Sequence, residues 1–368
     1  MWHNTEGATN LQNGESAPIL ALAKYIKEPI NQRLTETEPP PNLTKPCLKA
    51  AEYLTTGIVA KSLDSAGEER FSTKAAKFQG ELAQIEASQC LYQGIMGALG
   101  YSANKLPFLE LAHRVPLQTL ESITRDNISD EECLARQQAL LLGTAGLFPA
   151  QRRDGCQKSK SDDNWIGKLE RLWASFHPRE RMPPHAWHLF RVRPNNSPIR
   201  RLAAMSYLIL RYREKGIFDG VIDMVKEVPV GESHYSLEKG LVVTTSGYWA
   251  SHFDFGSASR ITNPTLLGSS RADDIITNVL LPFAFAWGEL TSHPELKRKT
   301  LALYRHYPKL AVNAIERHMK SQLGVNSSLV NSAQRQQGLI HIYHTLCAQG
   351  RCGCCPLSHL ETGDHIQV

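Results

Sequence analysis

The feature that most constrains this chain is a stretch near its C-terminus, where a helical apolar pattern runs directly into a cysteine-rich turn. The pattern spans residues 338–347, and four of the eight cysteines lie within residues 347–355. Cys347, Cys352 and Cys355 follow the spacing Cys-x4-Cys-x2-Cys on a short turn that contains glycine. This spacing suits a tetrahedral zinc ion or an iron–sulfur cluster, because both need thiolates that converge from a tight loop. We therefore predict a metal site here, and the spacing does not distinguish a zinc ion from an iron–sulfur cluster.

The cysteines also have a simpler interpretation, and the fourth ligand of a metal is open. Reduced thiols at such a turn can pack as small hydrophobic side chains. The candidates for the fourth ligand are Cys47, Cys354, His344 and His359. Three thiolates buried together without a cation would repel one another and raise each other's pKa. The thiols are therefore either protonated or bound to a metal, and their spacing favours the metal.

Helical periodicity dominates the rest of the chain. Apolar residues recur on one helical face up to Leu99, and Gly100 is placed to end that helix. Ser129-x-x-Glu132 has the pattern of a capping box, and Ser197-Pro198 is typical of a helix start. We predict a mainly α, multi-helical fold with short extended segments at the N-terminus and the cysteine-rich turn at the C-terminus.

Composition divides the chain into four predicted parts. Residues 1–45 form an extended segment and linker with a proline-rich break, and residues 46–150 form a helical subdomain. Residues 151–337 contain a basic loop followed by a second helical subdomain. Residues 338–368 hold the terminal helix and the cysteine cluster.

The overall composition excludes several classes of protein. Hydrophobic content is 42% and charged content 21%, which is ordinary for a globular protein and unlike a disordered one. The first residues are polar and lack the pattern of a signal peptide. The longest apolar run, residues 275–287, is too short to cross a bilayer. We predict a cytoplasmic protein without a membrane partner, whose cysteines are reduced.

Positive charge is concentrated in the middle of the chain. Residues 151–215 contain fifteen Lys and Arg against six Asp and Glu, so this window carries +9 in a chain whose net charge is +5. Arginines bind phosphates, and the unpaired amides of a helix N-terminus attract anions. The predicted anion- or nucleic-acid-binding residues are Arg191, Arg193, Asn195, Asn196, Arg200 and Arg201. The alternative is that the asparagines shape a turn while the arginines pair with acidic side chains of another helix.

His252 and Asp254 form a further, weaker candidate. If residues 252–254 were a strand, both side chains would lie on one face, as a general base and the group that orients it. Neither a nucleophile nor a second acid stands out nearby, so a structural histidine is the favoured interpretation. No Walker loop, dinucleotide-binding fingerprint or His-Glu-x-x-His motif is present in the sequence.

Several blocks of the sequence taken together resemble a bacterial family of unknown function, catalogued as domain of unknown function 2851. The blocks lie between Cys47 and Pro356, and they are specific as a set. They are residues 91–101 with Asn104 and Pro107-Phe108, residues 190–202, Tyr248-Trp249 with His252-Phe253, Asn278 with Pro282-Phe283, and residues 337–343 running into the cysteines.

The resemblance implies further expectations. Family members carry an additional N-terminal domain with acidic and histidine motifs that suggest a nuclease-like fold, and this sequence starts near the end of that domain. A nuclease-like domain is therefore an expected partner that is missing from this chain, and we expect the chain alone not to be catalytic. Family members also tend to carry a cysteine after the linker, so the resemblance favours Cys47 as the fourth metal ligand.

These observations lead to a ranked set of functional hypotheses. The first is an uncharacterised, metal-binding protein that associates with nucleic acid. The second is a structural or interaction protein without catalytic activity. The third and weakest is a hydrolase that uses His252 and Asp254.

Overall fold

The structure of the chain is a computed structural model, and it is built almost entirely of helices. This confirms the prediction of a mainly α, multi-helical fold. It describes residues 9–10, 16–17, 47–125, 128–152, 164–176, 180–190, 192–230, 234–256, 258–259 and 263–358. Within these residues, no helix is long and apolar enough to cross a membrane.

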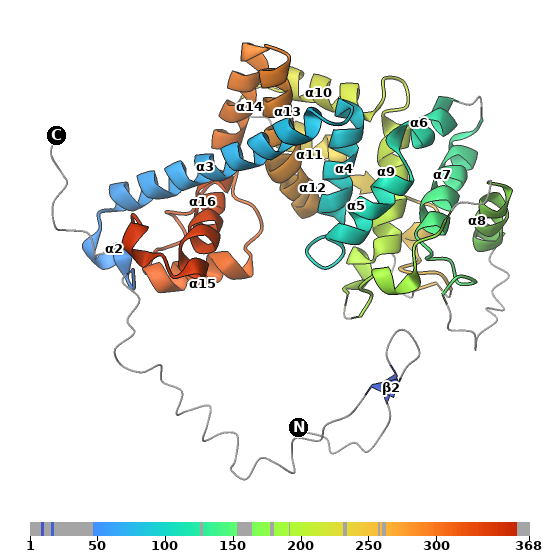
Figure 1. The fold of residues 1–368 in the computed structure, drawn as a ribbon, viewed down its shortest axis with the longest axis horizontal. Coiled ribbons are helices and arrows are strands. Elements are labelled where there is room, and N and C mark those ends of the chain that lie inside the picture. Colours follow the sequence, from blue (N-terminus) through green and yellow to red (C-terminus); the bar gives the residue numbers. More distant parts are fainter. Residues whose placement is uncertain are drawn as a thin grey trace, which may run out of the picture.

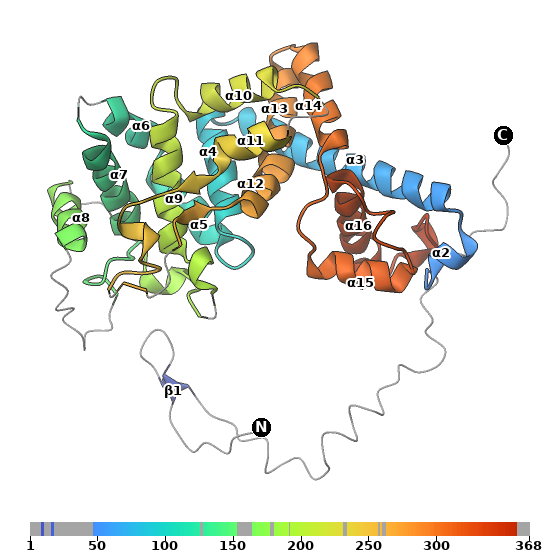
Figure 2. The ribbon, with the colours of Figure 1, turned by 180° about the vertical axis from the view of Figure 1, so that it is seen from behind.

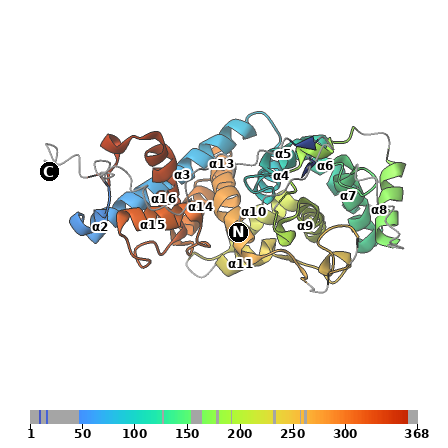
Figure 3. The same ribbon diagram turned by 90° about the horizontal axis from the view of Figure 1, so that it is seen from below.

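The helices are distributed along the long axis of the molecule, with α15 and α16 near one end and α8 at the other (Figures 1 and 3). The helices up to residue 175 are α2 (Ala50–Tyr53), α3 (Thr56–Leu82), α4 (Ala87–Leu99), α5 (Lys105–Arg114), α6 (Leu117–Arg125), α7 (Asp130–Thr144) and α8 (Asn164–Ser175). The helices between residues 184 and 250 are η2 (Pro184–Ala186), η3 (Pro194–Asn196), α9 (Pro198–Arg211), α10 (Ile217–Glu227), α11 (His234–Leu241) and η4 (Tyr248–Ala250).

The C-terminal part continues the same pattern and contains one π-helical turn, η5 (Ile276–Leu280), between two α-helices. Its elements are α12 (Ser269–Ile275), α13 (Leu281–Leu290), α14 (Pro294–His306), α15 (Ala314–Leu323), α16 (Ala333–Thr345), η6 (Cys347–Gln349) and η7 (Cys352–Cys354). Two short antiparallel pairs complete the described structure: β1 (Thr9–Asn10) with β2 (Ser16–Ala17), and β3 (Val243–Thr244) with β4 (Thr265–Leu267).

Several predicted helix boundaries are confirmed. Gly100 is the C-cap of α4. The side chain of Ser129 caps α7 by accepting a hydrogen bond from the backbone N–H of Glu132. α9 begins at Pro198, although the Ser197 side chain makes no capping hydrogen bond. Local capping and the fixed φ of proline determine these boundaries, so they can be read from a short window of sequence.

Two local expectations are corrected. The apolar pattern that ends at Leu99 suggests one helical face that starts at Leu82 and Ile85, but it does not belong to one helix, because α3 ends at Leu82 and α4 begins only at Ala87. The segment around His252 is not a strand but a bend that follows the 3-10 helix η4.

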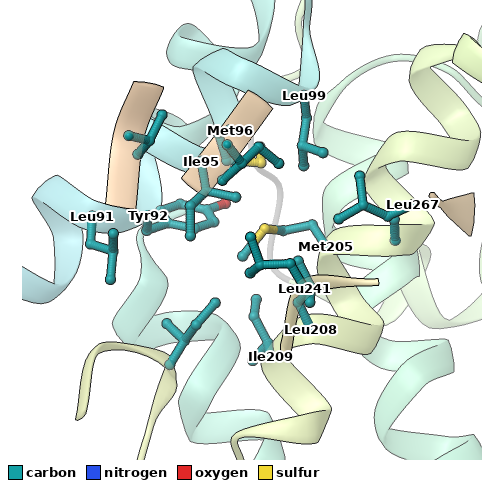
Figure 4. Close-up of a cluster of buried hydrophobic side chains, with 14 of the residues drawn as sticks. Leu91, Tyr92, Ile95, Met96, Leu99, Met205, Leu208, Ile209, Leu241 and Leu267 are labelled. Atoms are coloured by element: carbon teal, nitrogen blue, oxygen red, sulfur yellow. The ribbon is translucent and has the colours of Figure 1, made fainter. Parts of the chain in front are cut away.

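Buried hydrophobic side chains form two clusters. The larger one contains residues of α3 to α14, and Figure 4 shows its centre, where side chains of α4 and α9 point toward one another. The smaller one lies at the end of the molecule formed by α2, α15 and α16. The predicted domain limits at residues 45, 150 and 337 stay a prediction. The larger cluster itself runs across position 150 without a break in its packing.

Helix α3 belongs to both clusters. Its first half contributes Val59 and Leu63 to the smaller cluster, while Phe71 and Phe78 in its second half belong to the larger one. In Figures 1 and 2 this helix runs from the α2 end of the molecule to α13 and α14. α3 therefore connects the two parts of the core.

Helices α3 and α16 approach each other closely through two glycines. A Cβ atom at Gly338 would lie 2.1 Å from the carbonyl oxygen of Leu63, and one at Gly67 would lie 2.3 Å from that of Gln334. The interface is also polar at its edges, since Arg335 donates two hydrogen bonds to Asp64, at 2.9 and 3.1 Å. Only glycine fits at these two positions without moving one of the helices.

Candidate functional site

A cavity of about 640 Å³ lies beside the contact between α3 and α16. This volume is within the range of about 300–1,000 Å³ that is typical of sites for small molecules. Its walls come from α3, α4, the start of α5, α12, η5, α15 and α16. Residues that are far apart in sequence thus meet in one concave site.

The cavity is lined by five cations and two carboxylates. Each carboxylate pairs with one of the cations: Glu81 with Lys77 at 3.4 Å, and Asp274 with Arg271 at 3.3 Å. The remaining cations are Arg70, Lys74 and Lys105. In the part of the chain that the structure describes, no carboxylate forms an ion pair with any of these three. Three basic side chains of the cavity are therefore left without an ion pair to any carboxylate of the described residues.

Two of these cations share one uncharged acceptor on α16. The Oε1 atom of Gln337 accepts hydrogen bonds from Arg70 Nε at 2.7 Å and from Lys74 Nζ at 3.0 Å. Lys74 also donates to Oδ1 of Asn278, a residue of the π-helical turn. Burial lowers the pKa of Lys74 well below its usual value, and the charge of Arg70 adds to this effect. Burial lowers the pKa of Arg70 as well.

The wall of the cavity contains a tyrosine in an unusual backbone conformation. Tyr101 has φ of 54°, in the left-handed region that a bulky side chain rarely adopts. Its ring lies 3.2 Å from the guanidinium carbon of Arg271, and its hydroxyl accepts a hydrogen bond from Arg201 at 2.9 Å. The same hydroxyl donates to Oδ1 of Asn196 at 2.9 Å, and Arg201 donates to that oxygen at 2.8 Å. These contacts hold Tyr101 against the cavity and offset the cost of its backbone conformation.

Two of the predicted anion-binding residues are therefore found behind the cavity wall rather than on a surface. Arg201 is 5% exposed and also donates to the carbonyl oxygen of Leu266. Arg200 is fully buried and donates to carbonyl oxygens of Trp249, His252, Asn263 and Thr265. The expectation of an exposed positive surface does not hold for these two arginines, because both are buried and their terminal nitrogens donate to acceptors of the protein itself.

The other predicted members of that surface are distributed differently. Arg193 and Asn195 are exposed, and Asn196 is half-buried by its contact with Arg201. Arg191 lies outside the described residues. A role for Arg193 and Asn195 in binding nucleic acid stays a prediction.

The predicted metal ligands gather in the smaller hydrophobic cluster. Cys47 and Cys355 are each 4% exposed, and Cys347 packs against the same cluster. Burial raises the pKa of Cys355, with smaller contributions from the nearby Cys47 and Cys352 thiols. The sulfur of Cys47 accepts a hydrogen bond from Gln322 Nε2 at 2.9 Å. Among the residues that the structure describes, no three His, Cys, Asp or Glu side chains form a group that could hold a metal ion.

His252 and Asp254 take separate partners. Asp254 accepts two hydrogen bonds from Arg152, at 2.9 and 2.7 Å. His252 stacks on the ring of Tyr248, and its Nδ1 lies 2.8 Å from the carbonyl oxygen of the same residue. No hydrogen bond joins these two described side chains, so the structure offers no support for a base and its orienting carboxylate.

The cations of the cavity carry only a weak signal in the sequence. Arg70, Lys74 and Lys77 recur at helical spacing, and Phe71 and Phe78 on the same helix are buried. Cations beside an apolar stripe are usually a solvated helix face, so this signal alone is weak. Whether these cations line a cavity depends on where α16 packs. The local sequence pattern of α3 contains no information about that position.

Comparison with known proteins gives a family but no activity. Residues 2–311 match the family described as "Protein of unknown function (DUF2851)". The chain belongs to this family. No curated protein and no solved structure was found to match it. The resemblance noted in the sequence is thereby confirmed, while the absence of an N-terminal nuclease-like domain stays a prediction.

Three of the five blocks that carry the resemblance to DUF2851 contribute residues to the lining of the cavity. Gly94 and Tyr101 come from the first block, Asn278 from the fourth and Gln337 from the last. Gly94 is required for packing, since a Cβ atom there would lie 2.8 Å from Cγ1 of Val279. Gly94, Tyr101 and Asn278 lie within the residues that match the DUF2851 family, and Gln337 lies beyond them.

Proposed function

We propose that this protein binds a phosphate-bearing organic anion in the cavity between α3 and α16. The observation that carries the proposal is the set of three cations, Arg70, Lys74 and Lys105, which no described carboxylate neutralises. Like charges in a partly buried wall repel one another, and an anion relieves that repulsion. The guanidinium of Arg70 and the ammonium group of Lys105 match the oxygens of a phosphate.

The mixed lining of the cavity supports an organic ligand rather than an inorganic ion alone. Apolar side chains of Phe78, Leu109, Val279 and Ile340 line the same space as the cations. A ligand with an anionic group and an apolar or aromatic part, such as a nucleotide, fits both kinds of surface and the volume.

The same chemistry links the cavity to the nucleic-acid partner expected from the sequence. A nucleic-acid strand would have to place one phosphate or a terminal nucleotide among these cations. The exposed Arg193 and Asn195 lie outside the cavity lining and would be additional contacts. A free nucleotide and a strand end are therefore two sources of one ligand chemistry.

Isothermal titration calorimetry of the full chain tests the proposal, with orthophosphate, adenosine monophosphate and a short single-stranded oligonucleotide as ligands. We expect binding that weakens about tenfold or more in Arg70→Met, since a buried charge-assisted hydrogen bond is worth about 1.5–3 kcal/mol. Lys61→Met is the matched control, because Lys61 is an exposed cation on the same helix and lies outside the cavity. Equal loss in both variants, or no binding of any of the three ligands, contradicts the proposal.

We also propose a second function, metal binding by Cys47, Cys347, Cys352 and Cys355. It is supported by the proximity of Cys47 and Cys355, which belong to one hydrophobic cluster although they lie at opposite ends of the described helical core. A zinc ion or an iron–sulfur cluster would need these thiols as thiolates and would stabilise that form.

Metal analysis of protein purified without chelator tests this second proposal. We expect zinc or iron in the wild-type chain and in Cys90→Ala, which changes a buried cysteine elsewhere in the core. Cys355→Ser is expected to lose the metal. Metal-free wild-type protein would contradict the proposal.

A further inference from the structure

The Lys74 amine is held in place by two uncharged oxygens. It donates to Gln337 Oε1 at 3.0 Å and to Asn278 Oδ1. The Asn278 oxygen is presented to it because the amide nitrogen of that residue donates to the carbonyl oxygen of Asp274 at 2.8 Å. Both acceptors are amides, so neither contributes a negative charge that would stabilise an ammonium ion.

The charged groups around Lys74 mostly oppose its protonation. Arg70 shares the Gln337 oxygen, and Lys105 lies on the same cavity wall. The acid that acts on Lys74 is Asp274, which pairs with Arg271 at 3.3 Å. Burial together with Arg70 and Lys105 lowers the pKa of Lys74, and Asp274 offsets this only in part.

The two acceptors fix the direction in which the Lys74 amine can react in its deprotonated form. A neutral lysine has two N–H bonds and one lone pair. The N–H bonds are directed at the two amide oxygens, so the lone pair remains for the cavity that Lys74 lines. A desolvated amine beside other cations is the environment in which lysine acts as a nucleophile toward carbonyl carbon.

Lys77 and Lys105 do not share this environment. The Lys77 side chain is 65% exposed and pairs with Glu81 at 3.4 Å. Lys105 is exposed at the rim. Among the lysines of the cavity, Lys74 alone combines burial with two fixed acceptors.

We propose that Lys74 forms an imine with an anionic aldehyde or ketone, such as a phosphorylated aldehyde or a 2-oxo acid, held by Arg70 and Lys105. This inference rests on the proposed anion site. The amine nitrogen attacks the carbonyl carbon, and the C=N bond replaces the C=O bond. The carbonyl oxygen leaves as water with the two hydrogens of the amine, so the step needs no oxidant or reductant.

Reductive trapping on the full chain tests this inference, with pyridoxal 5′-phosphate as the anionic aldehyde and borohydride to reduce the imine to a stable amine. Peptide mass spectrometry then locates the label. We expect labelling of Lys74 to exceed that of exposed Lys61 by about tenfold or more, because each unit by which a lysine pKa falls increases the free amine about tenfold at neutral pH. Added orthophosphate should compete with this labelling but not with that of Lys61.

The variants and the binding data separate the possible outcomes. Lys74→Met should lose the label on Lys74 while Lys61→Met keeps it, and peptide mapping of the wild-type chain decides the question even if a variant folds poorly. If phosphate binds but Lys74 is labelled no faster than Lys61, the imine is excluded and the anion site stands. If Lys74 is labelled selectively without competition by phosphate, Lys74 is reactive but Arg70 and Lys105 do not hold the anionic group, and both the anion site and this inference fall. If neither is seen, both are wrong.

Discussion

Two pairs of cations are withdrawn from solvent in this protein, and they differ in what receives their hydrogen bonds. On α9, Arg200 and Arg201 donate mainly to backbone carbonyl oxygens of residues 249–266. On α3, Arg70 and Lys74 donate to amide side chains and line an open cavity. The α9 pair connects segments of irregular backbone through hydrogen bonds. The α3 pair faces a space that a ligand can enter.

The difference shows which buried charges point to function. Burial lowers the pKa of Arg200 to about 10, with a contribution from Arg201, yet nothing about Arg200 is available to a ligand. A depressed pKa alone therefore does not separate a structural cation from one that binds a ligand. The acceptors do separate them, because Arg200 donates to four backbone carbonyl oxygens, whereas Arg70 and Lys74 donate to amide side chains beside a cavity.

The largest effect is expected when the α9 pair is broken. Arg200→Met leaves buried carbonyl oxygens of four residues without their donor, and each such group costs about 1–3 kcal/mol when water does not replace the bond. We expect a loss of about 3 kcal/mol or more in the free energy of unfolding, measured by urea denaturation. Arg193→Met, at an exposed arginine near the same helix, should change it by less than about 0.5 kcal/mol. Similar effects of the two changes would contradict a structural role for Arg200.

A second, smaller effect is expected at the contact that builds the cavity. Gly338→Ala places a Cβ atom 2.1 Å from the Leu63 carbonyl oxygen, so α16 has to move. Overpacking of this kind costs about 1–3 kcal/mol. Because Gln337 moves with the helix, phosphate binding should weaken as well. The control is Gly80→Ala on α3, where a Cβ atom meets nothing within 4 Å. That substitution should leave binding unchanged and raise stability by about 0.5–1 kcal/mol.

Tyr101 contacts Arg201 of α9 and also lines the cavity beside α3, so it gives a third test. Tyr101→Phe removes a hydroxyl that accepts from Arg201 and donates to Asn196, while its ring can still cover Arg271. We expect a loss of about 1 kcal/mol, the net contribution of a typical hydrogen bond. Binding of phosphate should persist, which calorimetry on the same sample would check. Complete loss of binding would mean that the hydroxyl itself contacts the ligand.

The smallest effect on stability is expected at Lys74. Substitution there should stabilise the protein, whereas the three test substitutions above destabilise it. The folded protein lowers the pKa of Lys74, so the native state binds fewer protons than the unfolded chain between that lowered pKa and the usual value of about 10.4. Stability contributed by this group therefore rises with pH across that window and is lowest below it. Lys74→Met should raise the free energy of unfolding at neutral pH by about 1 kcal/mol or less and flatten its rise with pH. If Lys74→Met clearly destabilises the protein at neutral pH, the lowered pKa of Lys74 is contradicted. Lys77→Met, at an exposed lysine of the same helix, is the control.

The sequence predicted the class of fold and many helix boundaries, because these depend on local signals such as Ser129, Pro198 and Gly100. It did not predict the cavity. The acceptor of Arg70 is Gln337, 267 residues away, and helical periodicity states which face of a helix is apolar but not which helix covers it. The arginines of α9 were visible in the sequence as a cluster of charge. Their burial depends on carbonyls in residues 249–266, which have no side-chain signature.

The closeness of α3 and α16 also sets an order of events during synthesis. Every hydrogen bond that fixes Lys74 or Arg70 from α16 closes a loop of more than 260 residues, and such contacts form late because their closure entropy is high. A nascent chain can complete most of the larger hydrophobic cluster before Gln337 has left the ribosome. During that interval Arg70 and Lys74 remain solvated on an exposed helix. The ability to bind an anion would therefore appear as one of the last steps of folding, and it would distinguish finished molecules from incomplete ones.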